Sequence, residues 1–214
     1  IAAMIVPTHT PEEVWREARR DMPALWNKMK GQMGRVWRTL RLNKDLRKVP
    51  QLFEYRSPKG NNWLVAMWLT KKVVHVAPFV WYRGADGLYR AARIVEDGPS
   101  YHLSHHLLQR YGERFNSTAD ALVRLKEFVR ENMVFVAESA RNANAVRVGV
   151  TQGCLFGHWL VPDQLAQLTT FVDHGRLYAE QRAQMERLDV VRAESLRSIR
   201  LPGEVQPWDM PRRA

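Results

Sequence analysis

Residues 52–95 hold successive segments rich in β-branched and aromatic side chains, and this block constrains the fold more than any other feature. The first break between segments, residues 57–62, combines Pro, Gly and Asn, which favour turns. A later break, residues 84–87, contains two glycines and an aspartate and is typical of a hairpin. The pattern predicts an antiparallel meander of three or four strands. We expect these strands at residues 52–56, 63–70, 73–83 and 88–95.

The sequence before this block carries helical signals. Thr10 is a good capping residue, Pro11 suits the first helical position, and acids fill the first turn. We expect Pro23 to divide the apolar stripe that follows. A second, basic helix is expected at residues 28–48 and would bind a groove or a partner, although a merely solvated face fits the pattern equally well. Its apolar side carries Met29, Met33, Val36, Trp37 and Leu40, and its other side carries Lys28, Lys30, Arg35, Arg38 and Arg41.

After the β-rich block, helices and strands again come in runs. A helix with regularly spaced His and Arg follows residues 98–100, and another is expected at 118–133. Runs of this kind indicate an α+β fold rather than a parallel doubly wound sheet. We therefore predict an antiparallel β-sheet with N-terminal, central and C-terminal helices packed against it. Its later elements are strands at residues 134–138, 145–151, 153–161 and 168–173, then a helix at 176–200 and a tail.

The length of 214 residues suits one large domain, or one domain with extensions. We assign residues 1–50 to an N-terminal basic helical segment, 51–175 to an α+β core domain, and 176–214 to a C-terminal helix and tail. The first residue is Ile1, which is compatible with a fragment, a processed product or an unusual start codon.

The chain is strongly basic, with 33 Lys and Arg against 22 Asp and Glu and a net charge of +11. This excess, interleaved with aromatic residues, favours a nucleic-acid partner. A basic protein without such a partner, or one drawn to an anionic membrane surface, would have the same composition. No apolar run approaches the roughly 20 residues of a membrane span, and residues 1–6 are too few for a secretory signal core. Cys154 is the single cysteine, which rules out an internal disulfide, and we expect a cytoplasmic protein with no membrane partner.

A helix that begins after Ser104 carries the main candidate chemistry. His106, Arg110 and Arg114 recur every fourth residue, which places them on one helical face, and we expect them to face a shared concavity beside the sheet. Histidine exchanges a proton near neutral pH, and an arginine fork can hold two phosphate oxygens. Metal-independent cleavage of a phosphodiester needs such groups, so we assign His106 as base or acid and both arginines as phosphate ligands. Pairing of the arginines with surface acids such as Glu113 is the alternative.

Other residues extend this assignment. His102 and His105, near the start of the same helix, are second acid–base candidates. We predict no metal site and no cofactor, because the spacing lacks a His-x3-His pair on one helical face and the single cysteine excludes cysteine-based zinc frameworks. Thr170, in a predicted strand, could place a hydroxyl on phosphate, although Thr is also simply a common strand residue. Nucleic-acid contacts are assigned to Thr170 and to Lys28, Lys30, Arg35, Arg38 and Arg41.

The run Ser104-x-His106-x3-Arg110-x2-Glu113-Arg114, followed by a helix and several antiparallel strands, resembles the small RNase toxins of the RelE and BrnT type. Their fold class also covers barnase-like and colicin-like ribonucleases. The resemblance spans residues 101–173, with Thr170 at the place of a polar strand residue, and it implies metal-independent RNA cleavage. The meander before it and the long helix after it are not part of the toxin pattern, so a larger protein that kept the fold without catalysis is also compatible.

These features predict an RNA-directed protein, a metal-independent endoribonuclease of toxin-like type. Its partners would be RNA or another nucleic acid, and a protein inhibitor or other protein partner fits as well. Two alternatives stay open. One is a non-catalytic nucleic-acid-binding module whose basic helix and arginine row contact phosphates. The other is a phage- or defence-related protein-interaction module that uses the two end helices.

Overall fold

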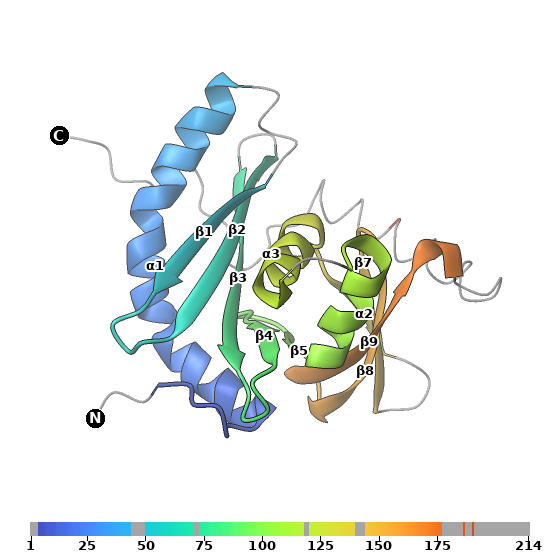
Figure 1. Cartoon of the computed structure of the whole chain (residues 1–214). Helices are drawn as coiled ribbons and strands as arrows, with labels where there is room; N and C mark the ends of the chain where they lie inside the picture. The colour runs from blue at the N-terminus through green and yellow to red at the C-terminus, as the bar shows by residue number, and fades with distance from the viewer. Residues whose placement is uncertain are drawn as a thin grey trace.

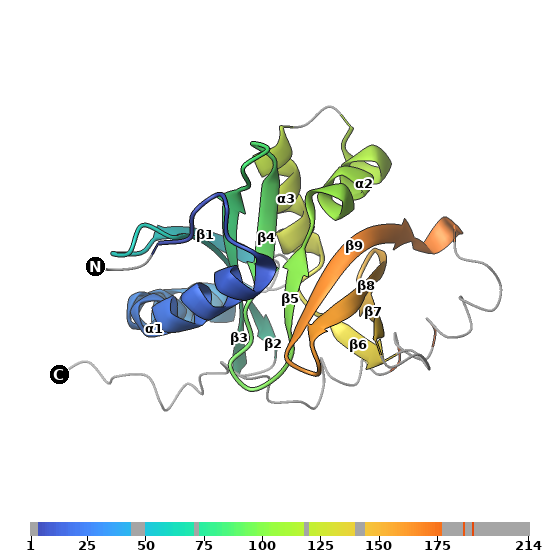
Figure 2. The same cartoon turned by 90° about the horizontal axis from the view of Figure 1, so that it is seen from below.

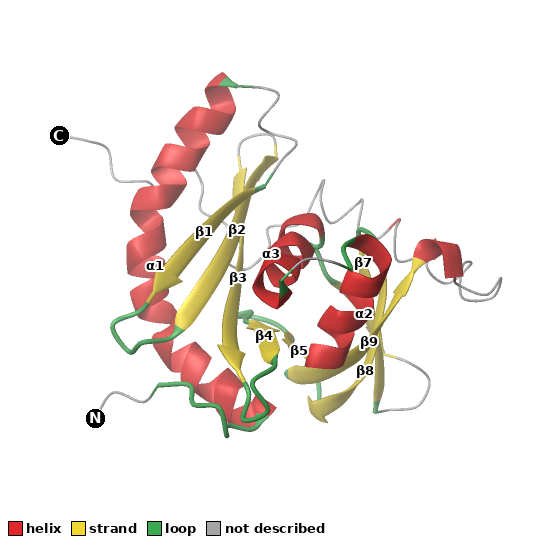
Figure 3. Ribbon diagram, viewed as in Figure 1, coloured by secondary structure: helices red, strands yellow, loops and turns green. Residues whose placement is uncertain are grey.

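The computed structural model describes residues 4–43, 50–70, 73–117, 120–139 and 144–176, together with residues 186 and 190. The strands are β1 (Gln51–Arg56), β2 (Asn62–Thr70), β3 (Val73–Arg83), β4 (Tyr89–Arg93), β5 (Ser100–Leu103), β6 (Val136–Ser139), β7 (Ala145–Val150), β8 (Gly153–Val161) and β9 (Leu165–Asp173). The helices are α1 (Pro11–Leu42), α2 (His105–Phe115) and α3 (Ala121–Glu131), followed by the short 3-10 helix His174–Arg176. Figures 1 and 3 show how they are arranged.

All nine strands of the described chain form one sheet, in the order β1-β2-β3-β4-β5-β9-β8-β7-β6. Neighbouring strands are antiparallel except β5 and β9, which run parallel. This confirms the predicted α+β class and an antiparallel sheet built from both halves of the chain. The N-terminal and central helices pack against it, as expected. The predicted helix at residues 176–200 and the tail lie outside the described residues, apart from residues 186 and 190.

The helices lie on both faces of the sheet: α1 covers one face of the first half, and on the opposite face α3 packs against β1 and β2 and α2 chiefly against β9. Figure 2 shows α1 on one side of β2 and β3 and the pair α2 and α3 on the other. Successive side chains of a strand point to opposite faces, so Trp63 and Val65 pack against α1, whereas Leu64 and Ala66 enter the core beneath α2 and α3. Because side chains on both faces of β2 are buried, the sequence of this strand is almost continuously apolar.

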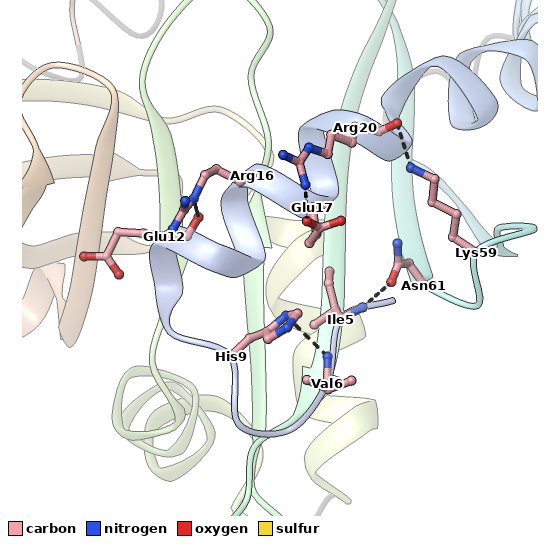
Figure 4. A network of polar contacts seen from close by, with 9 residues as sticks. All are labelled: Ile5, Val6, His9, Glu12, Arg16, Glu17, Arg20, Lys59 and Asn61. Carbon is pink, nitrogen blue, oxygen red and sulfur yellow. Dashed lines mark hydrogen bonds and ion pairs between the residues drawn. The ribbon is translucent and has the colours of Figure 1, made fainter. Parts of the chain in front are cut away.

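The start of α1 is fixed by local and long-range hydrogen bonds. Thr10 Oγ1 accepts from Glu13 N at 3.3 Å, and Glu13 Oε2 accepts from Thr10 N at 2.8 Å, a capping box that confirms the predicted helix start. Ile5 N donates to Asn61 Oδ1 at 2.8 Å, and Lys59 Nζ donates to a carbonyl oxygen of α1 at 3.2 Å (Figure 4). The turn between β1 and β2 therefore holds both the leading segment and the first turns of α1.

The prediction that Pro23 divides two helices is wrong, because α1 continues through it. The ring removes one backbone hydrogen bond, at a cost of about 3 kcal/mol. Met22, Leu25 and Met29 are buried along the same side of the helix, before and after the proline. Burial of each contributes about 1.5–3 kcal/mol, which offsets that cost. The basic helix predicted at residues 28–48 is thus the second half of α1, and residues 44–49 lie outside the described chain.

The strand β5 is a second correction. The sequence predicts no strand at residues 100–103, but these residues pair with β4 and β9 directly before α2 begins. Ser100 N donates to Gln164 O at 2.8 Å, and Ser104 N donates to Leu168 O at 3.0 Å. A strand of four residues is too short to show a clear period, and its partner lies far along the chain. This pairing joins the two halves of the sheet.

None of the helices in the described ranges is both long enough and apolar enough to span a membrane.

A buried carboxylate ties α1 to the sheet. Asp21 is fully buried, and its Oδ2 accepts from Asn61 Nδ2 and Trp63 Nε1, both at 2.9 Å. We expect Asp21→Ala to lower the free energy of unfolding by about 2–4 kcal/mol, because two buried donors lose their acceptor. Urea unfolding measures this loss. Glu12→Ala, which removes a half-buried carboxylate from the same helix, should cost less than about 1 kcal/mol, and equal losses for both variants would contradict the anchoring role.

Candidate functional site

The helix α2 begins where the sequence predicts. Ser104 is its N-cap, and its Oγ accepts from Leu107 N at 3.3 Å. Leu107 and Tyr111 are fully buried on the side that faces the sheet, and the hydroxyl of Tyr111 donates to Gln152 Oε1 at 2.9 Å. Because this side is fixed, the orientation of the opposite, polar side of α2 is fixed as well.

The three residues of the predicted row differ in their surroundings. His106 and Arg110 are exposed, and Arg114 is half-buried. Arg110 Nη1 lies 3.1 Å from Glu113 Oε2, and Arg114 Nε lies 3.4 Å from Asp173 Oδ2. Both arginines therefore make ion pairs, as the alternative interpretation proposed. Solvent-exposed pairs of this kind are weak, about 0–1 kcal/mol, so a phosphate could replace the acid at Arg110.

Three cavities in the described part of the chain, of about 280, 320 and 490 Å³, are lined by residues other than His106, Arg110 and Arg114. The row thus lies outside these three cavities. Thr170 does not join it either. Phe171 packs under α2, with its ring 5.5 Å from that of Tyr111, so the preceding residue of the strand points to the opposite face of the sheet.

His102 lies apart from the other histidines, buried in β5. Its side chain faces α1, and its Nε2 lies 2.8 Å from the hydroxyl oxygen of Tyr82. Burial lowers the pKa of His102 to about 3, with a smaller contribution from Arg90. Such a side chain stays neutral near pH 7 and is a poor match for proton transfer there. The acid–base role assigned to it has no support in this geometry.

His105 lies beside His106 at the start of α2. The two ring centroids are 3.9 Å apart. The pKa of His105 is lowered, chiefly by burial and then by the nearby His106 and Arg90, which favours the neutral, base-competent form. The structure therefore brings His105 and His106 together at a helix N-terminus, where the helix dipole favours anions.

The largest of the three cavities, about 490 Å³, contains groups that sequence analysis missed. Tyr82, Asp86 and Arg90 line it together with His102. Arg90 Nη1 donates to Asp86 Oδ1 at 2.8 Å, and Arg90 Nη2 donates to Asp86 Oδ2 at 2.6 Å, and this fork lowers the pKa of Asp86 well below its usual range. The turn signal at residues 84–87 predicted the position of Asp86 in a hairpin. No sequence feature near His102 indicated that β5 would place this histidine in the same cavity as Asp86.

Burial of His102 predicts an acid-sensitive fold. The folded protein keeps this side chain neutral, whereas the unfolded chain binds a proton near the ordinary pKa of 6.5. Below that pH the unfolded state binds more protons, so stability is full above pH 6.5 and falls as the pH drops toward 3, by up to about 1.4 kcal/mol per pH unit. We expect His102→Gln to reduce the loss of unfolding free energy between pH 6 and pH 4 by about 2–3 kcal/mol. Urea unfolding at several pH values checks this, and an unchanged profile would contradict it.

The exposed side of the second half of α1 carries five cations. Lys28, Lys30, Arg35, Arg38 and Arg41 are all exposed, and the opposite side of the helix is buried against the sheet. The guanidinium of Arg41 lies over the ring of Trp37, 4.9 Å from its centroid. No described carboxylate forms an ion pair with Lys28, Lys30, Arg35 or Arg38. We call these five residues the cationic face of α1.

Within the described ranges, no cluster of three or more His, Cys, Asp or Glu side chains could hold a metal ion. No family model, curated protein or solved structure matches this chain. The resemblance of residues 101–173 to RelE- and BrnT-type toxins therefore stays a prediction.

Proposed function

We propose that this protein binds the phosphate backbone of RNA through the cationic face of α1. The observation that carries the proposal is the charge of this surface. Its five cations are exposed, and the sequence has no acidic residue between Asp21 and Asn43. Binding of such a surface to a nucleic acid releases counterions, which provides the sequence-independent part of the affinity.

The geometry of α1 supports contact with a chain of phosphates. From Lys28 to Arg41 the helix rises by roughly 20 Å, at about 1.5 Å per residue. The buried side, which includes Met29, Met33 and Val36, keeps the helix in one orientation. The cations therefore stand on a rigid support, and Trp37 offers a partly exposed aromatic surface beside Arg41.

An anionic membrane surface would attract the same charges, but the packing of α1 disfavours it. An amphipathic helix binds a bilayer by burying its apolar side among the lipids. The apolar side of α1 is already buried against β2 and β3. Only the electrostatic part of membrane binding would remain, whereas a nucleic acid needs no apolar side.

The salt dependence of RNA binding tests the proposal. For single-stranded RNA, the slope of log K against log salt is about −0.7 for each phosphate neutralised. We expect the double variant Lys30→Gln/Arg38→Gln to flatten the slope by about 1.4. The matched control Lys126→Gln/Arg130→Gln removes two cations from α3, on the other side of the sheet, and should leave the slope unchanged. Equal slopes for all three proteins would contradict binding by α1, and a DNA strand of the same sequence measures selectivity for RNA.

Cleavage of RNA at the start of α2 is a second candidate function. The observation that favours it is the pair His105 and His106, with a lowered pKa of His105 and Arg110 one turn further along the same helix. His106 would act as base or acid, and Arg110 would exchange Glu113 for a phosphate oxygen. The ion pairs of Arg110 and Arg114 weigh against this candidate, and for that reason we place binding first.

A further inference from the structure

The arginine at the end of β4 is buried and has no acidic partner among the described residues. Arg93 is 8% exposed, and its Nε has no hydrogen-bond partner in the described part of the chain. Among the described residues no carboxylate forms an ion pair with it, and its guanidinium instead lies 4.7 Å from the ring centroid of Phe135. Burial lowers the pKa of Arg93 to about 10, so it remains a cation near neutral pH. A buried charge without a counter-charge is costly, typically by several kcal/mol.

The cavity of about 320 Å³ lies next to this cation. Tyr101, directly opposite Arg93 on the neighbouring strand, also lines it, and its hydroxyl has no hydrogen-bond partner in the described chain. Burial raises the pKa of Tyr101 to about 12, so the hydroxyl keeps its proton and can donate it. Apolar walls come from Trp26, Pro78 and Phe135. The cavity thus combines a cation and a hydroxyl donor with apolar walls, a combination typical of small-molecule sites.

We propose that this cavity binds a small organic carboxylate. The two carboxylate oxygens would accept from the guanidinium of Arg93 and from the hydroxyl of Tyr101, and the apolar body of the ligand would contact Phe135 and Trp26. An arginine fork matches a carboxylate in geometry and charge. This site is separate from the cationic face of α1, and the inference does not depend on RNA binding.

The acids near the cavity favour a single negative charge on the ligand. Glu96 and Asp97 also line it. Glu96 Oε1 accepts from Trp26 Nε1 at 2.7 Å, which holds that carboxylate at the α1 side of the cavity. A monoanion balances the one guanidinium, whereas the second charge of a phosphate monoester would be repelled by these acids.

Calorimetric titration of the full chain tests the site. The probes are phenylacetate, indole-3-acetate and octanoate, each paired with its neutral amide. We expect at least one carboxylate to bind, its amide to bind at least about 10-fold more weakly, and Arg93→Met to weaken the carboxylate by roughly 10- to 100-fold, because a hydrogen bond to a charged group is lost. Arg83→Met, on an exposed arginine of β3, is the matched control and should bind as the wild type does. Absence of binding for all three carboxylates, or equal binding by Arg93→Met, overturns the proposal.

Two further measurements keep the test independent of the stability of that variant. Without ligand, Arg93→Met should unfold at the same temperature as the wild type or higher, because a buried charge without a partner is removed. A marked fall in the unfolding temperature would show that the cation is needed by the fold itself and would overturn the proposal. Tyr101→Phe, which keeps the ring, should weaken the carboxylate by about 3- to 10-fold, and an unchanged affinity would also overturn it.

Discussion

Replacing Phe128 with Ala is expected to lower the free energy of unfolding by about 3–5 kcal/mol. Phe128 is fully buried in α3. Its ring meets that of Tyr111 edge-on, with centroids 5.1 Å apart and an interplanar angle of 88°, and it meets Phe135 in the same way at 6.4 Å. The ring therefore joins α3 to α2 and to the segment that leads into β6. Its removal leaves a cavity and also loses the favourable edge-to-face contacts.

Urea unfolding followed by circular dichroism measures this loss. Phe128→Leu, which keeps most of the apolar volume, should cost about 1.5 kcal/mol or less. Phe115→Ala removes an aromatic ring that is 42% exposed at the end of α2, and we expect its cost to be well below that of Phe128→Ala. If Phe128→Ala stayed within 1 kcal/mol of the wild type, the ring of Phe128 would not hold α3 against α2.

Features with local causes could be predicted from the sequence. The N-caps Thr10 and Ser104 accept from backbone groups three residues further along, so all the residues involved lie in one short window. The strands β1 to β4 and β6 to β8 follow from runs of β-branched and aromatic residues broken by turns. Only residues 168–173 of β9 could be predicted in this way, because residues 165–167 pair with β5 and form no such run. The side of α1 that carries the exposed cations could be predicted for the same reason, because helical periodicity alone separates it from the apolar stripe.

Features that depend on distant contacts could not be predicted. Pro23 is tolerated because the apolar residues before and after it are buried against the sheet. The neighbouring sequence contains the proline but gives no information about this distant contact. The strand β5 exists because β9 supplies its hydrogen-bond partners. His102, which was predicted near the start of α2, is part of this strand and is buried beside Tyr82.

The same distinction applies to the candidate sites. Spacing placed His106 and Arg110 on one face of α2, but the partner of Arg114, Asp173, comes from β9 and left no local signal. The buried cation at Arg93 had a weak signal, since Arg93 ends β4 directly after Ala91 and Ala92 and is followed by Ile94. An arginine at such a position needs a special explanation, and only the structure shows that no described carboxylate provides one.

His106→Ala is expected to lower RNA cleavage by roughly 10²- to 10⁴-fold, if the second candidate function holds, because a positioned acid or base contributes about that much. Binding of RNA should change little, since the cationic face of α1 is untouched. A gel cleavage assay and a binding titration on the same RNA separate the two effects. His158→Ala is the matched control, because His158 lies on β8 and not on α2, and this variant should cleave as the wild type does.

Two conditions of the same assay test the mechanism. Cleavage should persist in EDTA, because the proposed chemistry uses His106 and arginines rather than a metal. A DNA strand of the same sequence should resist cleavage, since the 2′-hydroxyl of RNA is the proposed nucleophile. Loss of cleavage in EDTA with recovery on addition of a divalent cation would overturn this mechanism. The wild type could also cleave none of a varied set of RNAs and still bind them with a steep salt dependence. In that case the ion pairs of Arg110 and Arg114 are a stable feature of α2, and the protein is an RNA-binding module without catalysis.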